Sequence, residues 1–157
     1  MHERFADMLF RARQNAGYSR EKAAELLDSS ARSLSYYEAG RQVPDKLAAR
    51  MVELYHAPLL GYTYLRQTET GQLILPHVEF ADAASSALRL RVGLSKAVEQ
   101  QPCIEDICWR GDVGEKERKA LLDCLPVLQY LASACIGFWI LCKEKAAANR
   151  TRNGLLP

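Results

Sequence analysis

The chain has 157 residues, of which 48% are hydrophobic and 25% are charged, so it can bury a core in one or two small domains. This composition excludes a disordered chain. The formal net charge of +2 is too small to indicate a nucleic-acid-binding protein by itself, so any such surface must come from the placement of the charges.

The spacing of apolar residues is helical throughout, and no alternating strand pattern stands out, so the predicted fold class is all-α. In the first part of the chain we expect five helices. Four of them are expected over residues 3–16, 30–40, 44–55 and 58–66. The remaining one, second in chain order, begins at residue 19 and ends at a break over residues 28–30.

The segment from Gly17 to Pro44 predicts two short helices joined by a tight turn. Ser19 and Ser30 are suited to cap the N-termini of these helices, because a serine hydroxyl accepts from a free backbone N–H of the first turn. Ala23 and Ala24 are small, which lets the two helices cross closely.

The chain after residue 68 predicts a linker and then two long helices. Residues 69–78 form the expected linker, in which QLIL could pair briefly or pack as an apolar clasp. A helix over 79–100 is expected to stop at Pro102, and RGDVGE reads as a polar turn. The last helix is expected over 115–148 with a kink at Pro126, and a frayed tail completes the region 79–157.

The stretch CLPVLQYLASACIGFWILC, residues 124–142, is apolar on nearly every face. Such a helix is buried in a core, buried between subunits, or placed in a membrane. Nineteen residues roughly span a bilayer, but Pro126, Gln129 and Ser133 weaken that interpretation. We therefore expect residues 124–142 to be buried against the 79–100 helix and against a second copy of the chain, with a membrane span as the alternative.

The five cysteines, at positions 103, 108, 124, 135 and 142, form an odd set without a CxxC pair. We expect no disulfide framework, and a reducing cytoplasm is the simplest location. The opening MHERFADMLFRAR lacks the apolar core of a secretory signal, which favours the same location.

We expect neither a metal nor a cofactor. Cys103 and Cys108 could ligate a metal in principle, but no second Cys or His pair completes four ligands. The three histidines, His2, His56 and His77, share no spacing with each other or with carboxylates.

The segment 17–44 resembles the Cro/CI-type, or Xre-type, helix-turn-helix family, and the likeness extends over about residues 4–66. The residues that align without a gap to the positions of the family's pattern are Gly17, Tyr18, Ser19, Arg20, Glu21, Ala23, Ala24, Leu27, Asp28, Ser29, Ser30, Leu34, Ser35, Tyr37, Glu38, Gly40 and Pro44. The departures from it are Arg20 for Gln, Ala23 for Leu, Asp28 for Gly and Ser29 for an apolar residue. Asp tolerates a left-handed backbone better than most residues, so we expect the turn to survive.

The resemblance implies a DNA-reading third helix. The base-edge contacts that it implies are Ala31, Arg32, Ser33 and Tyr36, and the phosphate contacts are Arg20, Ser35, Arg41, Gln42 and Lys46. Arg32 could donate a bidentate pair to guanine. The resemblance also implies that Arg13 pairs inward with Glu38.

The resemblance implies a five-helix Cro/CI-like domain over residues 1–68, followed by a dimerising long-helix hairpin. The expected function is a sequence-specific, double-stranded-DNA-binding transcriptional regulator acting as a homodimer, of the kind that bacterial mobile elements carry. A repressor is favoured, because occluding a promoter requires only binding. The alternative is a protein-interaction or membrane-tethered module with a repurposed helix-turn-helix. An enzyme is not expected, because no nucleophile–base pair, metal cluster or Gly-rich phosphate loop stands out.

Overall fold

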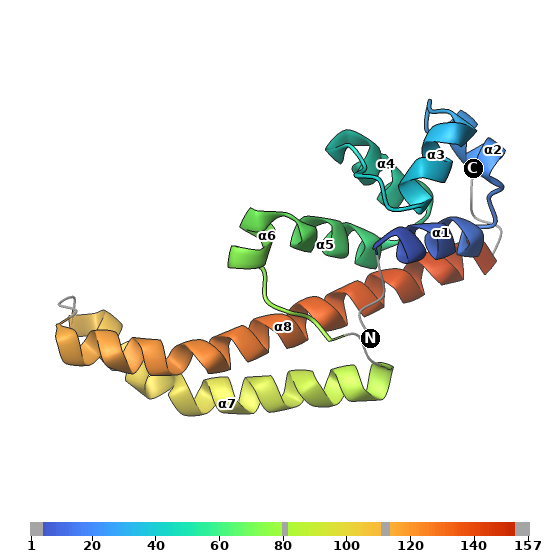
Figure 1. Cartoon of the computed structure of the whole chain (residues 1–157). Helices are drawn as coiled ribbons and strands as arrows, with labels where there is room; N and C mark the ends of the chain where they lie inside the picture. The colour runs from blue at the N-terminus through green and yellow to red at the C-terminus, as the bar shows by residue number, and fades with distance from the viewer. Residues whose placement is uncertain (1–4, 80–81, 111–113, 153–157) are drawn as a thin grey trace. The chain divides into compact units, whose positions relative to one another are not determined.

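A computed structural model describes residues 5–79, 82–110 and 114–152 of the chain. The described residues are helical apart from turns and connections, and none of them lies in a strand, which confirms the all-α prediction. In chain order the helices are α1 (Phe5–Asn15), α2 (Arg20–Leu26), α3 (Ala31–Glu38), α4 (Asp45–Leu54), α5 (Pro58–Gln67), α6 (Glu69–Ile74), α7 (Ala83–Arg110) and α8 (Glu115–Arg152), as labelled in Figure 1.

The chain forms two compact units. The first comprises residues 1–75 together with 143–157, and the second comprises residues 76–142. The domain boundaries expected from the sequence, at residues 68 and 79, stay a prediction.

The core of the first unit lies among α1 to α5. Its buried residues are Leu9, Ala12, Ala23, Ala24, Leu27, Leu34, Val43, Ala48, Met51, Tyr55 and Leu60. The buried methyl groups of Ala23 and Ala24 bring α2 against α3, as their small size predicted.

Caps and left-handed residues set where the helices of the first unit begin and end. Ser19 accepts a hydrogen bond from the Lys22 N–H at 3.1 Å, and Ser30 accepts one from the Ser33 N–H at 2.9 Å, so both predicted N-caps are confirmed. Gly40 closes α3 with φ at +105°. Asp28 has φ at +48°, which confirms the left-handed conformation expected at the turn.

A buried carboxylate ties the first three helices together. Arg13, on α1, donates from Nε to Glu38 Oε1 at 2.6 Å and from Nη2 to Oε2 at 3.2 Å. Arg20, on α2, donates from Nη2 to Glu38 Oε2 at 2.9 Å. The Glu38 side chain at the end of α3 is only 6% exposed. The pairing of Arg13 with Glu38 is therefore confirmed, and Arg20 joins it.

The two guanidinium groups decide the ionisation of Glu38. Burial of the carboxyl group opposes its ionisation, but the hydrogen bonds from Arg13 and then Arg20 outweigh burial and hold its pKa below the ordinary value. The hydrogen bond to Glu38 likewise raises the pKa of Arg13. The cluster is therefore charged at neutral pH: one carboxylate faces two guanidinium groups, of which Arg13 is buried and Arg20 is partly exposed to water.

The expected linker contains a helix. Residues Glu69–Ile74 form α6, capped by the Thr68 hydroxyl, which accepts from the Gly71 N–H at 2.9 Å. The expectation of an apolar clasp is wrong, because Leu73 is 86% exposed and Ile74 is also exposed. Thr68 and Glu69 supply an N-cap and a first-turn acid, which stabilise a helix end without any apolar packing.

The end of α8 belongs to the first unit. There the Glu144 carboxylate accepts a hydrogen bond from the Leu59 N–H, in the first turn of α5. Burial of this carboxyl group is the larger influence and raises its pKa.

The second unit is a helical hairpin of α7 and the part of α8 up to Cys142 (Figure 1). The prediction that Pro102 stops the first of these helices is wrong, since α7 runs on to Arg110 with Pro102 inside it. Pro102 removes one backbone donor and sets its ring against the carbonyl four residues earlier, which costs about 3 kcal/mol. Ile107, further along the same helix, is buried, and such burial stabilises by about 1.5–3 kcal/mol.

Small side chains let the two helices of the hairpin approach closely. A Cβ at Gly93 of α7 would meet the Cα of Leu131 on α8 at 3.2 Å, so the backbones are nearly in contact there. The Sγ of Cys124 donates to Gln100 Oε1 at 3.3 Å, and the Lys96 Nζ lies 5.6 Å from the centre of the Tyr130 ring. These contacts confirm that the long helices pack together.

Helix α8 is long and apolar enough to cross a membrane, judged by length and composition over Glu115–Ala146. Only 17% of its most apolar window is buried inside the protein. Pro126 lies within the helix, and residues 149–152 continue it, so a frayed tail can begin only at residue 153. That tail and residues 111–113 of the predicted RGDVGE turn lie outside the described residues.

Replacing Glu38 with Gln is expected to lower the free energy of unfolding by about 3 kcal/mol, because the buried Arg13 charge loses its counter-ion. Chemical unfolding at pH 7 measures this change. The matched control is Glu25→Gln, which breaks the exposed Lys22–Glu25 pair and should cost under about 1 kcal/mol. Equal losses in the two variants would contradict a structural role for the Glu38 cluster.

The contribution of Glu38 to stability is expected to depend on pH. Because the folded-state pKa is lowered, this contribution is complete above the unfolded pKa of about 4.3 and is lost as pH falls through the folded value. The difference in unfolding free energy between the wild type and Glu38→Gln should therefore shrink below about pH 4.3. A difference that stays constant down to acid pH would contradict this linkage.

Candidate nucleic-acid interface

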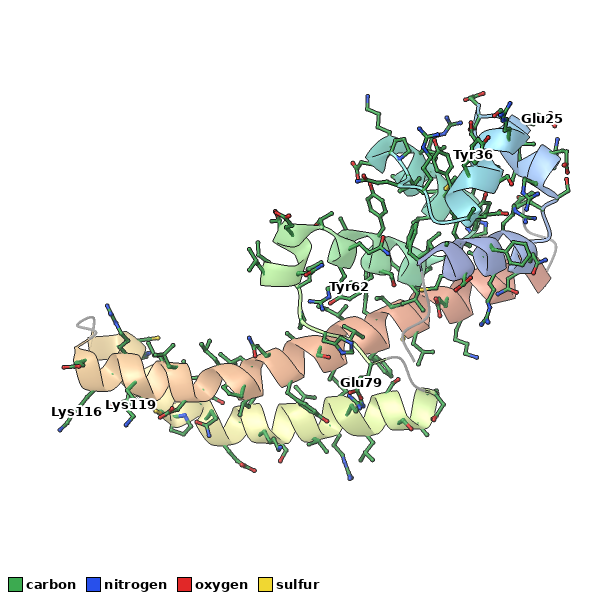
Figure 2. The ribbon with its side chains drawn as sticks, in the orientation of Figure 1. Glu25, Tyr36, Tyr62, Glu79, Lys116 and Lys119 are labelled. Atoms are coloured by element: carbon green, nitrogen blue, oxygen red, sulfur yellow. The ribbon has the colours of Figure 1, made fainter. Side chains whose placement is uncertain are left out.

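The outward face of α3 is led by Arg32 and Tyr36. Leu34, between them in the sequence, is buried in the core, which leaves Arg32 and Tyr36 on the opposite side of the helix with both side chains exposed. Figure 2 shows Tyr36 projecting from α3. Helix α3 therefore has a packed back and an exposed polar face.

Arg32 and Tyr36 are in contact one helical turn apart. The Arg32 Nε donates to the Tyr36 hydroxyl at 3.0 Å, and the guanidinium carbon lies 5.7 Å from the ring centre. This contact holds the guanidinium over the helix face before any ligand arrives. A bidentate contact with guanine requires two parallel donors, which the terminal nitrogens of the guanidinium can present.

The other candidates on α3 are less exposed. Ala31 packs against the edge of the core, and Ser33 and Ser35 are half-buried. The Ser33 hydroxyl lies 2.8 Å from that of Ser30, so it is part of the N-cap. The structure therefore brings Arg32 and Tyr36 together as the exposed pair and leaves Ala31, Ser33 and Ser35 at the margins of the face.

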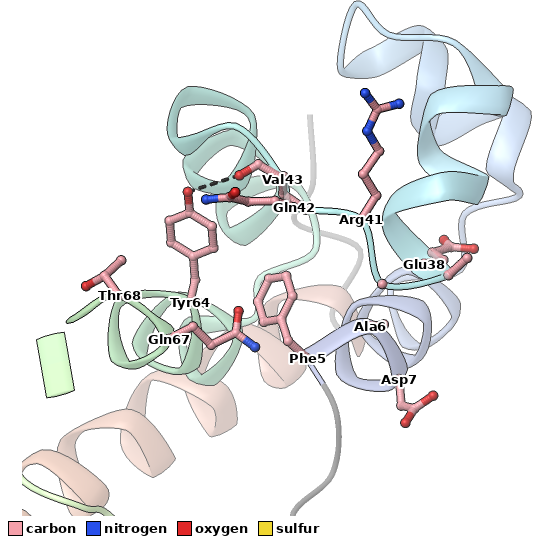
Figure 3. Close-up of a pocket in the computed structure, with 12 residues that line it drawn as sticks. Phe5, Ala6, Asp7, Glu38, Arg41, Gln42, Val43, Tyr64, Gln67 and Thr68 are labelled. Atoms are coloured by element: carbon pink, nitrogen blue, oxygen red, sulfur yellow. Dashed lines mark hydrogen bonds between the residues drawn. The ribbon is translucent and has the colours of Figure 1, made fainter.

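The segment between α3 and α4 carries the next set of candidates. Arg41, Gln42 and Lys46 are exposed. Tyr64 fixes the segment, because its hydroxyl donates to the Val43 carbonyl at 3.0 Å (Figure 3). A groove of about 720 Å³ runs between this segment, the start of α1 and the end of α5. The Arg41 side chain extends from the segment alongside α3 (Figure 3).

Arg20 occupies a different environment from the other phosphate candidates. Its side chain is 36% exposed, and both its Nε and its Nη2 donate to Glu38. A phosphate contact from Arg20 would therefore come from a group that Glu38 already holds. The sequence did not predict this bond, because the family pattern has an uncharged Gln at this position.

A further arginine that the sequence did not single out shapes the turn. Arg50, on α4, donates from Nη2 to the Leu26 carbonyl at 3.1 Å and to Asp28 Oδ2 at 2.8 Å. It thereby links α4 to the turn between α2 and α3 through an exposed contact. No local signal predicts this contact, because Arg50 lies 22 residues from Asp28 along the chain.

A comparison with known protein families identifies the domain to which α1 to α5 belong. A family model described as a helix-turn-helix domain matches residues 4–61. Residues 4–61 are a helix-turn-helix domain of the Xre/Cro group. The match confirms the resemblance inferred from the segment 17–44, and DNA is the partner that such a domain implies. The family match does not extend to α7 and α8. Comparisons of the chain with curated proteins and with solved structures found no match.

Replacing Ser30 with Ala is expected to lower the free energy of unfolding by about 1 kcal/mol, because α3 loses its N-cap. Thermal or chemical unfolding measures the change. Ser29→Ala is the control, since it removes a neighbouring hydroxyl and leaves the Ser30 cap in place. A Ser30→Ala variant as stable as Ser29→Ala would mean that this cap does not stabilise the helix.

Proposed function

We propose that this protein is a sequence-specific regulator of transcription that binds double-stranded DNA and reads the major groove with α3. The observation that carries the proposal is the joined, exposed pair of Arg32 and Tyr36 on the outward face of α3, within a helix-turn-helix domain. The major groove admits one α-helix, and the pair faces the side away from the core.

In this proposal the contacts divide into two kinds. Arg32 recognises a guanine edge and Tyr36 a neighbouring base, with Ala31 and Ser33 at the margin of the same contact. Exposed Arg41, Gln42 and Lys46 contact phosphates next to the recognition helix, and Ser35 and Arg20 do so from its sides. The phosphate contacts supply sequence-independent affinity, whereas Arg32 supplies discrimination.

We further propose that the protein acts as a cytoplasmic repressor and as a homodimer. A single short helix contacts few base pairs, and helix-turn-helix dimers overcome this limit by binding two half-sites one helical turn apart. The second unit, which is helical and lies outside the matched domain, supplies the contact between subunits. Repression follows from occupying a promoter, which requires no additional activity.

One observation favours a second candidate function. Helix α8 has the length and composition of a membrane span and is little buried, which fits a membrane-tethered or partner-binding module that has lost its DNA contacts. The two candidates differ in their salt dependence. A DNA-binding regulator binds an operator with an affinity that falls steeply as salt rises, whereas the other module binds no operator.

Arg32→Ala is expected to weaken binding to a selected operator by about 5- to 150-fold, the equivalent of losing 1–3 kcal/mol of base recognition. Binding to random duplex DNA should change little, because the phosphate contacts remain. Fluorescence anisotropy with labelled duplexes over a salt series measures both affinities.

The control for this experiment is Arg11→Ala, which removes the same charge from an exposed position on α1. Arg11→Ala should weaken both duplexes slightly and alike. Equal losses on operator and random DNA in Arg32→Ala would contradict base recognition by Arg32. A wild type that binds both duplexes with the same affinity would contradict the proposed function itself.

A further inference from the structure

Helix α8 carries an exposed apolar stripe with the spacing of a helix–helix interface. Its members are Leu125, Leu128, Ala132, Cys135, Trp139 and Cys142, all of them exposed. They follow one another at alternating intervals of three and four residues, which is the heptad spacing by which helices pack side by side. From residue 125 to residue 142 the sequence contains no Asp, Glu, Lys or Arg.

The contact between Lys96 and Tyr130 identifies the two flanks of the hairpin. Each residue of an α-helix is rotated by about 100° from the one before it. Gly93 is on the side of α7 that faces α8, and Leu131 is on the side of α8 that faces α7. Around its helix, Lys96 is displaced to one side of Gly93. Tyr130 is likewise displaced to one side of Leu131. Because Lys96 and Tyr130 touch, these two sides form one flank of the hairpin.

The same rotation places Leu94 and Val98 on the opposite side of α7 from Lys96. Leu128 and Ala132 likewise lie on the opposite side of α8 from Tyr130. Leu94 and Val98 are exposed and lie at the level of the close approach marked by Gly93. Leu94, Val98 and the α8 stripe together are named here the apolar flank of the hairpin.

The opposite flank carries most of the charged side chains of the hairpin at this level. They are Lys96 and Glu99 on α7 and Lys119 on α8, beside Leu88, Tyr130 and Ser133; Figure 2 shows Lys119 near the start of α8. The hairpin is thus amphipathic as a pair of helices, although α8 alone looks apolar almost all round. Such a two-helix surface is completed in soluble proteins by a second helix pair.

We propose that the apolar flank is the surface through which two copies of this chain associate, hairpin against hairpin, in a four-helix bundle. This inference rests on the homodimer of the proposed function and assigns its interface to named side chains. A two-fold interface brings a surface against its own copy, so that surface must be self-complementary. Along α8 this flank carries no charges, so no like charges of the two α8 helices oppose each other there. On α7 the exposed Arg91 borders the flank, one helical turn before Leu94.

A bilayer fits the hairpin less well than a second copy does. Helix α7 packs along α8, so placing α8 in hydrocarbon would carry Arg89, Lys96 and Glu99 of α7 in with it. Each buried charge is costly there. Packing two hairpins through the apolar flank leaves these charges in water.

The size of the flank suits a stable dimer. From Leu125 to Cys142 the stripe is about 26 Å long at a rise of 1.5 Å per residue, and two helices side by side are about 20 Å wide. The projected area is therefore about 500 Å². Because side chains ridge this surface, its accessible area is larger than its projected area. The accessible area therefore approaches the roughly 800 Å² that each partner buries in a standard interface.

The test measures the mass of the full-length protein in solution by sedimentation or light scattering. The wild type should have about twice the chain mass of 17.6 kDa. Leu128→Glu and Leu94→Glu should weaken the dimer by roughly 100-fold or more, because each buries an unpaired carboxylate in the interface. Leu128 is 41% exposed within one chain, so the variant is expected to fold, as circular dichroism would verify.

The matched control is Leu88→Glu. Leu88 is a 52% exposed leucine on α7, and the helical rotation places it on the side of Glu99, in the opposite flank. This variant should remain dimeric. Alkylation by N-ethylmaleimide gives a second measurement: Cys135 on the flank should react more slowly in the wild type than in Leu128→Glu, whereas exposed Cys103 on the other flank should react alike in both.

Each alternative outcome has a distinct meaning. A monomeric wild type at tens of micromolar would overturn both the proposed dimer and this interface. A dimer that survives Leu128→Glu and Leu94→Glu would overturn the interface alone and leave the proposed function standing. A monomer that floats with phosphatidylcholine–phosphatidylglycerol vesicles, and stops doing so in Leu128→Glu, would overturn the inference by making the flank a lipid-binding surface.

Discussion

The ionised carboxylate of Glu38 is the constraint on which the first unit depends. Glu38 ends α3, and its partners Arg13 and Arg20 lie on α1 and α2, so one buried group fixes three helices at once. A cluster of this kind stabilises little unless every member is satisfied, and here the side chains are. By holding the inward end of α3, the cluster leaves Arg32 and Tyr36 to face outward, where a DNA-binding role requires them.

Much of the first unit was predictable because its signals are local. Ser19 and Ser30 act within three residues of their own position, and the left-handed backbone at Asp28 follows from its short polar side chain. The pairing of Arg13 with Glu38 was accessible only through the family resemblance. Helical spacing also identified buried Leu34 and thereby the outward face of α3.

Helix α6 was missed although its cap, Thr68, is a local signal. The other features that sequence reasoning missed depend on tertiary contacts or on opposing effects. Arg20 bonds to Glu38 and Arg50 bonds to Asp28 across long stretches of chain, and no local pattern encodes those partners. Pro102 was expected to end a helix, but α7 continues through it to Arg110, and Ile107 in that continuation is buried. The α8 sequence predicts an apolar helix without saying which side α7 covers, so the apolar flank emerges only from the packed hairpin.

The central claim is that the outward face of α3 reads DNA sequence. The most direct measurement is a selection from random duplexes with purified full-length protein at near-physiological salt. The account predicts enrichment of a sequence with two related half-sites about one helical turn apart, each containing a guanine within reach of Arg32. Failure to enrich any sequence, from protein shown to be folded, would contradict it.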